Sequence, residues 1–160
     1  MLKKILYALN QMNINDINYL VSDNLYNKLN SIIEESNNKQ EICHYENIKI
    51  TPSLNREYED EEYNYLEILF NCNCLRYITS SISNEVIAGD NTNKINFVIK
   101  GIVKKDKKAI PQPSYKCEGC GTSYDVFDNS ICPNCGNTYD LKKYDYIMDD
   151  LNIWKNYPYY

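Results

Sequence analysis

The amino-acid sequence predicts an α+β fold, in which N-terminal helices pack on a bent, cone-like antiparallel sheet and a four-cysteine module is inserted near the end. Three observations predict it. The apolar period is 3.6 residues before Glu41 and changes to 2 after it. Two long alternating segments flank a polar, glycine-containing stretch. The cysteines near the C-terminus form two close pairs.

The segment before Glu41 predicts two helices joined by a short turn. The first helix has its apolar face at spacings of i, i+3, i+4 and i+7, on Leu2, Ile5, Leu6 and Leu9. Asp16 is expected to cap the turn that follows. Ser22 is a favourable N-cap for the second helix, and Asp23 suits its first turn. The apolar stripe of this helix consists of Leu25, Leu29, Ile32 and Ile33, and Asn37 and Asn38 are expected to end it.

Alternating side chains predict three strands between Glu41 and residue 103. Pro52 ends the first strand or places it at an edge of the sheet, and residues 55–62 are expected to form a loop or a ragged extension. Residues 63–82 form the clearest strand, with a core face of Leu66, Ile68, Phe70, Cys72 and Cys74. Residues 83–93 contain Gly89-Asp90-Asn91 and predict a hairpin connection. The next strand has its core face on Ile95, Phe97, Ile99 and Val103.

The two long strands are expected to pair in an antiparallel hairpin whose core face meets the stripe of the second helix. Residues 104–114 then read as a polar, proline-containing linker. Beyond the cysteines, a short strand followed by a helical turn is expected to carry Tyr139, Tyr144, Tyr146, Ile147, Leu151 and Trp154. We therefore expect a main domain of residues 1–107 and 139–160, interrupted by a linker and metal module over residues 108–138.

The cysteine pairs are two copies of C-x-x-C-G, formed by Cys117, Cys120, Cys132 and Cys135. Four thiolates in two close pairs satisfy a tetrahedral Zn²⁺ ion, and such a closed site does not activate water. Gly121 and Gly136 follow each second cysteine, where a positive φ costs glycine little. The alternatives are a disulfide or a redox C-x-x-C motif, but a redox motif opens a helix and is not duplicated with trailing glycines. The spacing predicts one structural zinc ribbon.

Composition limits the partners. The chain has 160 residues and a net charge of −5, which argues against a general nucleic-acid binder. Residues 117–136 contain no Lys or Arg. An acidic run comprises Glu57, Glu59, Asp60, Glu61 and Glu62, and a basic run comprises Lys100, Lys104, Lys105, Lys107 and Lys108. Each run is either a solvated segment or a docking patch, and the basic run is the better candidate for an acidic partner or an anionic lipid surface.

The location is expected to be cytoplasmic. No apolar run approaches the length of a transmembrane helix, and no secretion signal is recognised. The chain has 7 cysteines, which without such a signal fit a reducing compartment. Peripheral association with the inner face of a membrane is a second expectation, because it would use the basic run.

Several segments resemble a known family. They are residues 16–20, residues 22–26, residues 47–50, the hairpin Asn84-Glu85-Val86-Ile87-Ala88-Gly89-Asp90 and the segment Tyr144-Asp145-Tyr146-Ile147-Met148-Asp149-Asp150-Leu151. In order and spacing they are similar to the Tim-forty-four-like domain family, in its bacterial version with an attached zinc ribbon, over about residues 10–153.

The resemblance implies a nuclear-transport-factor-two-like fold, a cone of helices and bent sheet around an apolar pocket, with the ribbon inserted into it. The mitochondrial relative tethers an import chaperone to the translocase at the membrane. Bacterial relatives often carry transmembrane segments upstream of the domain. Since this sequence shows none, and because fold does not fix function, neither membrane anchoring nor the import role is transferred.

The remaining candidate residues give no catalytic set. His44 is expected to be a surface or satisfied sheet histidine, and Cys43, Cys72 and Cys74 to be buried apolar residues. Three tyrosines could donate hydrogen bonds in a pocket, but no committed base accompanies Tyr63, Tyr65 and Tyr77. The sequence thus favours a non-catalytic binding or scaffold protein that accepts an apolar group or a protein partner. The alternatives are a small pocket enzyme of the same fold and a nucleic-acid-associated ribbon protein.

Overall fold

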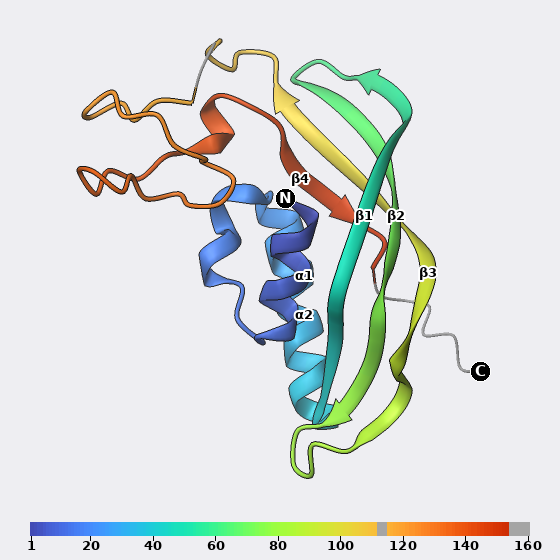
Figure 1. Cartoon of the computed structure of the whole chain (residues 1–160). Helices are drawn as coiled ribbons and strands as arrows, with labels where there is room; N and C mark the ends of the chain where they lie inside the picture. The colour runs from blue at the N-terminus through green and yellow to red at the C-terminus, as the bar shows by residue number, and fades with distance from the viewer. Residues whose placement is uncertain (112–114, 154–160) are drawn as a thin grey trace.

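The computed structural model describes residues 1–111 and 115–153 (Figure 1). It is an α+β structure with a four-stranded antiparallel sheet, which confirms the predicted class. The elements in order are α1 (Leu2–Asn10), the 3-10 helix η1 (Asn15–Leu20), α2 (Asp23–Lys39), β1 (Glu41–Glu59), β2 (Tyr63–Ser80), β3 (Val86–Asp106), the 3-10 helix η2 (Leu141–Lys143) and β4 (Ile147–Leu151). No helix in the described ranges is long and apolar enough to cross a membrane.

Local capping explains where the helices begin and end. The Ser22 hydroxyl accepts a hydrogen bond from the backbone N–H of Leu25 at 3.2 Å, as expected of an N-cap. Helix α2 ends at Lys39, slightly later than predicted, because Gln40 adopts the left-handed conformation at φ 58°. The expectation for Asp16 is wrong: it lies in the first turn of η1, whose N-cap is Ile14.

Strand β1 is longer than the sequence pattern indicated. Of the two expectations for residues 55–62, the strand extension is confirmed for residues 55–59, since β1 continues to Glu59 and pairs Tyr58 with Tyr65. The strand order β1-β2-β3-β4 puts β1 at an edge of the sheet, so Pro52 sits where its missing N–H is tolerated. Asp60 then closes the β1–β2 turn by accepting the backbone N–H groups of Glu62 and Tyr63.

The β2–β3 connection lies earlier than predicted. The turn falls between Ser80 and Val86, and Gly89 is inside β3 rather than in the turn. Gly89 has φ 78°, and a Cβ there would lie 2.5 Å from the carbonyl oxygen of Arg76. Glycine therefore permits an irregularity within a continuous strand, which is why β3 spans Val86–Asp106 and not only residues 94–103.

The C-terminal elements occur in the opposite order to the prediction. The helical turn η2 comes first and the strand β4 follows it, while Trp154 lies outside the described residues. On its outer edge β4 is bridged by the segment before α2, since Val21 pairs in parallel with Met148. The backbone N–H of Ser22 also donates to the carbonyl oxygen of Met148 at 2.8 Å.

One core cluster joins the helices to the sheet. In Figure 1 both α-helices lie on the same side of the curved sheet. The cluster includes Leu25 and Leu29 from α2, Phe70 and Ile99 from the sheet, and Val126 from the segment between the cysteine pairs. The division into a main domain and a residue 108–138 module stays a prediction, although Val126 shows that the two share apolar contacts.

The exposed edge of β1 is closed near its start by a side chain. The backbone N–H of Tyr45 donates to the Asn10 Oδ1 atom at 3.0 Å, and the Asn10 Nδ2 atom donates to the Tyr45 carbonyl at 2.9 Å. Asn10 thus pairs with both backbone groups of Tyr45, as a neighbouring strand would.

Replacing Asn10 with Ala should lower the free energy of unfolding by about 1–2 kcal/mol, because both Tyr45 backbone groups lose their partners. Chemical denaturation measures this. The exposed Asn30→Ala variant on α2 is the control and should change stability by less than about 0.5 kcal/mol. Equal effects of the two substitutions would contradict the edge role of Asn10.

Candidate metal centre

Each C-x-x-C-G motif folds into a tight turn. The Gly121 N–H donates to the carbonyl oxygen of Cys117 at 2.8 Å, and the Gly136 N–H donates to that of Cys132 at 3.0 Å. Gly121 has φ 74° and Gly136 has φ 76°, as the sequence predicts. Short antiparallel bridges flank both turns, at Lys116 with Ser123 and at Ile131 with Thr138. The two turns therefore present their cysteines in the same local geometry.

The four sulfur atoms meet in one small volume. All four lie within 4.8 Å of one another, and they belong to Cys117, Cys120, Cys132 and Cys135. Sulfur atoms of different turns lie 3.4 Å apart in Cys117 and Cys135, and 3.7 Å apart in Cys120 and Cys132. Sulfur ligands at 2.3 Å from a tetrahedral zinc ion are about 3.8 Å apart. The cluster therefore has the size that a metal with four thiolate ligands requires.

The surroundings stabilise negative charge on these sulfurs unevenly. Side-chain hydrogen bonds from Asn134 and Thr122 lower the pKa of Cys120 to about 5. The backbone N–H of Asn137 also favours a thiolate at Cys135, but hydrogen bonds with the neighbouring cysteine sulfurs outweigh it and raise the pKa of Cys135 to about 12. A bound cation would remove this competition and let all four thiols ionise.

The ribbon is fastened to the rest of the protein by the loop between its turns. Val126 is fully buried, and the Tyr19 hydroxyl donates to the carbonyl oxygen of Phe127 at 3.1 Å. The Lys4 amine donates to the carbonyl oxygen of Asp128 and to the Tyr19 hydroxyl. Sequence reasoning missed this attachment, because a lone valine in a short loop has no periodicity to reveal it.

The three remaining cysteines are buried in the sheet and do not join the four-sulfur cluster. Burial raises the pKa of Cys72 and of Cys74 to about 11. Both are therefore neutral at physiological pH, and they pack in the apolar core with Cys43.

His44 is held in the sheet by its neighbours. Its ring stacks on Tyr77 at a centroid distance of 4.6 Å, and its Nε2 atom lies 2.8 Å from the Thr79 hydroxyl. Partial burial lowers the pKa of His44, so the ring is neutral in the folded protein. The Tyr77 hydroxyl in turn donates to the Glu46 carboxylate at 2.7 Å. These contacts suit a structural histidine.

Most lysines of the basic run form ion pairs within the molecule. Lys100 pairs with Glu67 at 2.7 Å and Lys104 with Asp149 at 2.8 Å. The remaining pairs of the run join Lys105 with Asp145 at 3.8 Å and Lys107 with Glu59 at 3.0 Å. Glu59 belongs to the acidic run, so the two runs face each other in part, which favours a structural role over docking.

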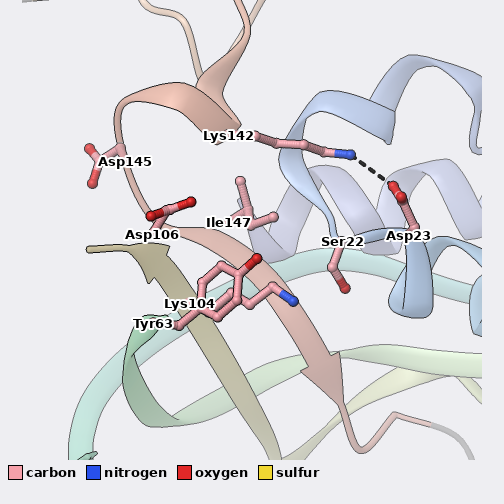
Figure 2. A pocket seen from close by; sticks show the side chains of 8 residues that line it. All are labelled: Ser22, Asp23, Tyr63, Lys104, Asp106, Lys142, Asp145 and Ile147. Atoms are coloured by element: carbon pink, nitrogen blue, oxygen red, sulfur yellow. Dashed lines mark hydrogen bonds and ion pairs between the residues drawn. The ribbon is translucent and has the colours of Figure 1, made fainter. Parts of the chain in front are cut away.

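A polar cavity of about 220 Å³ opens beside the start of α2 (Figure 2). It is lined by Ser22, Asp23, Tyr63, Lys104, Asp106, Lys142, Asp145 and Ile147. Lys142 pairs with Asp23 at 3.0 Å, and this ion pair lowers the pKa of Asp23. Since Lys104 is also paired, both amines that line this cavity already have a carboxylate partner.

Neither a scan against protein-family models nor a search of curated proteins finds a match to this chain.

Replacing Cys117 or Cys132 with Ser should abolish metal binding and lower the melting temperature of the whole protein by about 10 °C, since Val126 links the ribbon to the core. Elemental analysis and calorimetry measure the two effects. The exposed Glu118→Gln variant is the control and should leave both unchanged. A variant that loses metal but melts like wild type would show that the ribbon is energetically separate.

Lowering the pH below about 6.5 should reduce stability, because unfolded His44 binds a proton that the folded protein disfavours. The chain has one histidine, so its NMR titration is unambiguous. The folded midpoint should lie below 6.5, and His44→Gln should remove the pH dependence of unfolding between the two midpoints. A midpoint above 6.5 would contradict the assigned environment.

Proposed function

We propose that this chain is a non-catalytic binding or scaffold protein, built as a Tim-forty-four-like domain with a cone-like sheet and one structural Zn²⁺. The ion is held by Cys117, Cys120, Cys132 and Cys135. The observation that carries the proposal is the four-sulfur cluster in a loop that contributes Val126 to the common core. Such a loop is a rigid appendage that can present a surface to a partner.

Zinc suits the site for chemical reasons. Four thiolates are soft ligands, and a tetrahedral arrangement of four sulfurs is typical of zinc or iron–sulfur centres. One closed set of protein ligands leaves no position for water or substrate. The proposed role of the ion is therefore to stabilise the ribbon.

The enzyme alternative finds little support in the contacts. Proton abstraction in a cone-like pocket would need a carboxylate or histidine among apolar groups. The cavity in Figure 2 is polar, and its two lysines are held by Asp23 and Asp149. His44 is occupied by Tyr77 and Thr79.

The nucleic-acid alternative is disfavoured by charge. The ribbon has no Lys or Arg between its first and last cysteine, and Glu118, Asp125 and Asp128 are exposed on it. Binding to phosphates needs concentrated basic groups. A protein partner is consistent with an acidic chain. The case for peripheral binding to anionic lipid is weak, because most lysines of the basic run are already paired with carboxylates.

Purified protein should contain one zinc ion per chain, coordinated by four sulfurs at about 2.3 Å. X-ray absorption spectroscopy and elemental analysis measure this. Crosslinking in the native cell should then yield a protein that binds the purified chain in a defined ratio. Metal-free protein, or the absence of any protein that binds again after purification, would overturn the proposal.

A further inference from the structure

The turn between β2 and β3 carries an exposed apolar patch. Ile82 is 71% exposed, Val86 41% and Ile87 51%. We call this group, with the turn that joins β2 to β3, the hairpin tip. In Figure 1 it lies at the end of the sheet that is remote from the ribbon. All three lie within residues 82–87, and large aliphatic side chains exposed in one short segment can mark a contact site.

The hairpin tip is well ordered by hydrogen bonds. The Ser80 hydroxyl accepts the backbone N–H groups of Ile82 at 3.2 Å and Ser83 at 3.3 Å. The Ser80 N–H donates to the carbonyl oxygen of Glu85 at 2.9 Å. The Ser81 N–H donates to the carbonyl oxygen of Gln40 at 2.8 Å, which ties the turn to the end of α2. The exposed side chains are therefore displayed on a preformed surface.

A register shift directs Ile87. Ile78 pairs with Ala88 and Thr79 pairs with Val86, so Ile87 has no partner in the ladder. A bulge of this kind turns a side chain out of the regular alternation. In an uninterrupted ladder, successive side chains point to opposite faces of the sheet. Ile87 departs from this pattern, and its side chain is exposed to solvent.

The hairpin tip itself carries an acidic side chain and no basic one. Residues 77–93 contain Glu85 and Asp90 but no Lys or Arg, and Glu41 lies at the adjacent start of β1. The nearest lysine in sequence, Lys94, donates to the carbonyl oxygen of Asn47 at 2.8 Å, and Lys39 at the end of α2 pairs with Glu35 at 2.6 Å. We propose that the hairpin tip inserts Ile82, Val86 and Ile87 into an apolar cleft of a protein partner whose rim is basic.

The same charges argue against other occupants. Anionic lipid would repel the carboxylates, and the tip lacks the basic and aromatic side chains that anchor proteins at membrane interfaces. A symmetric contact with a second copy would bring like charges together around Glu85. A partner with a basic rim gains from both the apolar insertion and the surrounding charge.

This inference rests on the proposed function, and its test separates the two. A photo-crosslinking residue is placed at Ile87 and, as a control, at Ile131, which is equally exposed at 51% but lies on the ribbon. The protein captured in the native cell is identified and purified, and its affinity for the zinc-loaded chain is measured by calorimetry. Capture should be specific to position 87.

Ile82→Ser and Ile87→Ser should each weaken binding of that protein about tenfold or more, whereas Ile131→Ser should change it less than twofold. Glu85→Lys should also weaken binding, and the loss should shrink as salt is added. The variants are checked for folding by circular dichroism. If binding depends on Ile131 and not on the hairpin tip, this inference is wrong while the scaffold function stands.

Other outcomes also overturn the inference. Tip-dependent cosedimentation with phosphatidylcholine and phosphatidylglycerol vesicles, without a protein partner, would assign the hairpin tip to a membrane. Self-association in the ultracentrifuge that Ile87→Ser abolishes would assign it to a second copy. If no protein binds at either position, both this inference and the proposed function fail.

Discussion

The architecture depends on bringing four sulfur atoms together in a segment that could not fold alone. Between its cysteine pairs the ribbon buries Val126 and little else, so chain entropy would keep it open without a crosslink. The paired turns set the cysteines in place, and a metal would close them. Once closed, the ribbon offers Val126 to the core and the carbonyl oxygens of Phe127 and Asp128 to Tyr19 and Lys4. A metal bound by these sulfurs would be coupled to the stability of the domain through these contacts.

The N-terminal segment has a second structural role, because it reaches both edges of the sheet. At the β1 edge, the side chain of Asn10 hydrogen-bonds to both the backbone N–H and the carbonyl oxygen of Tyr45. At the β4 edge, Val21 and Ser22 bond to Met148. An unpaired edge invites association with other chains, so these contacts protect a sheet that would otherwise be open on both sides. Farther along β1, Pro52 removes one donor from the edge.

Local chemistry determined what could be predicted. The Ser22 cap and the glycines after each cysteine pair were correct because each depends on neighbouring residues alone. Gly89-Asp90-Asn91 was assigned to the hairpin connection, but it lies inside β3. Asp90 accepts the backbone N–H groups of Thr92 and Asn93 there, so its turn chemistry forms an irregularity within the strand and not the connection itself. Asn10 and Val126 contact residues that are far away in the sequence, and no periodic pattern in the sequence predicts such contacts. The structural detail missed by sequence lies mainly in these nonlocal bonds.

The distribution of charge explains why an apolar surface is the more informative candidate for recognition. Most lysines of the basic run are held by carboxylates from β1, β2 and the segment around β4, so the field they present to a partner is weak. The carboxylates of Glu85 and Glu41, by contrast, stand beside exposed aliphatic groups on a turn ordered by Ser80. In the folded chain most lysines of the basic run have carboxylate partners, whereas Ile82 and Ile87 stay exposed to solvent. Burying these two isoleucines against a partner would be favourable, and folding of the isolated chain does not bury them.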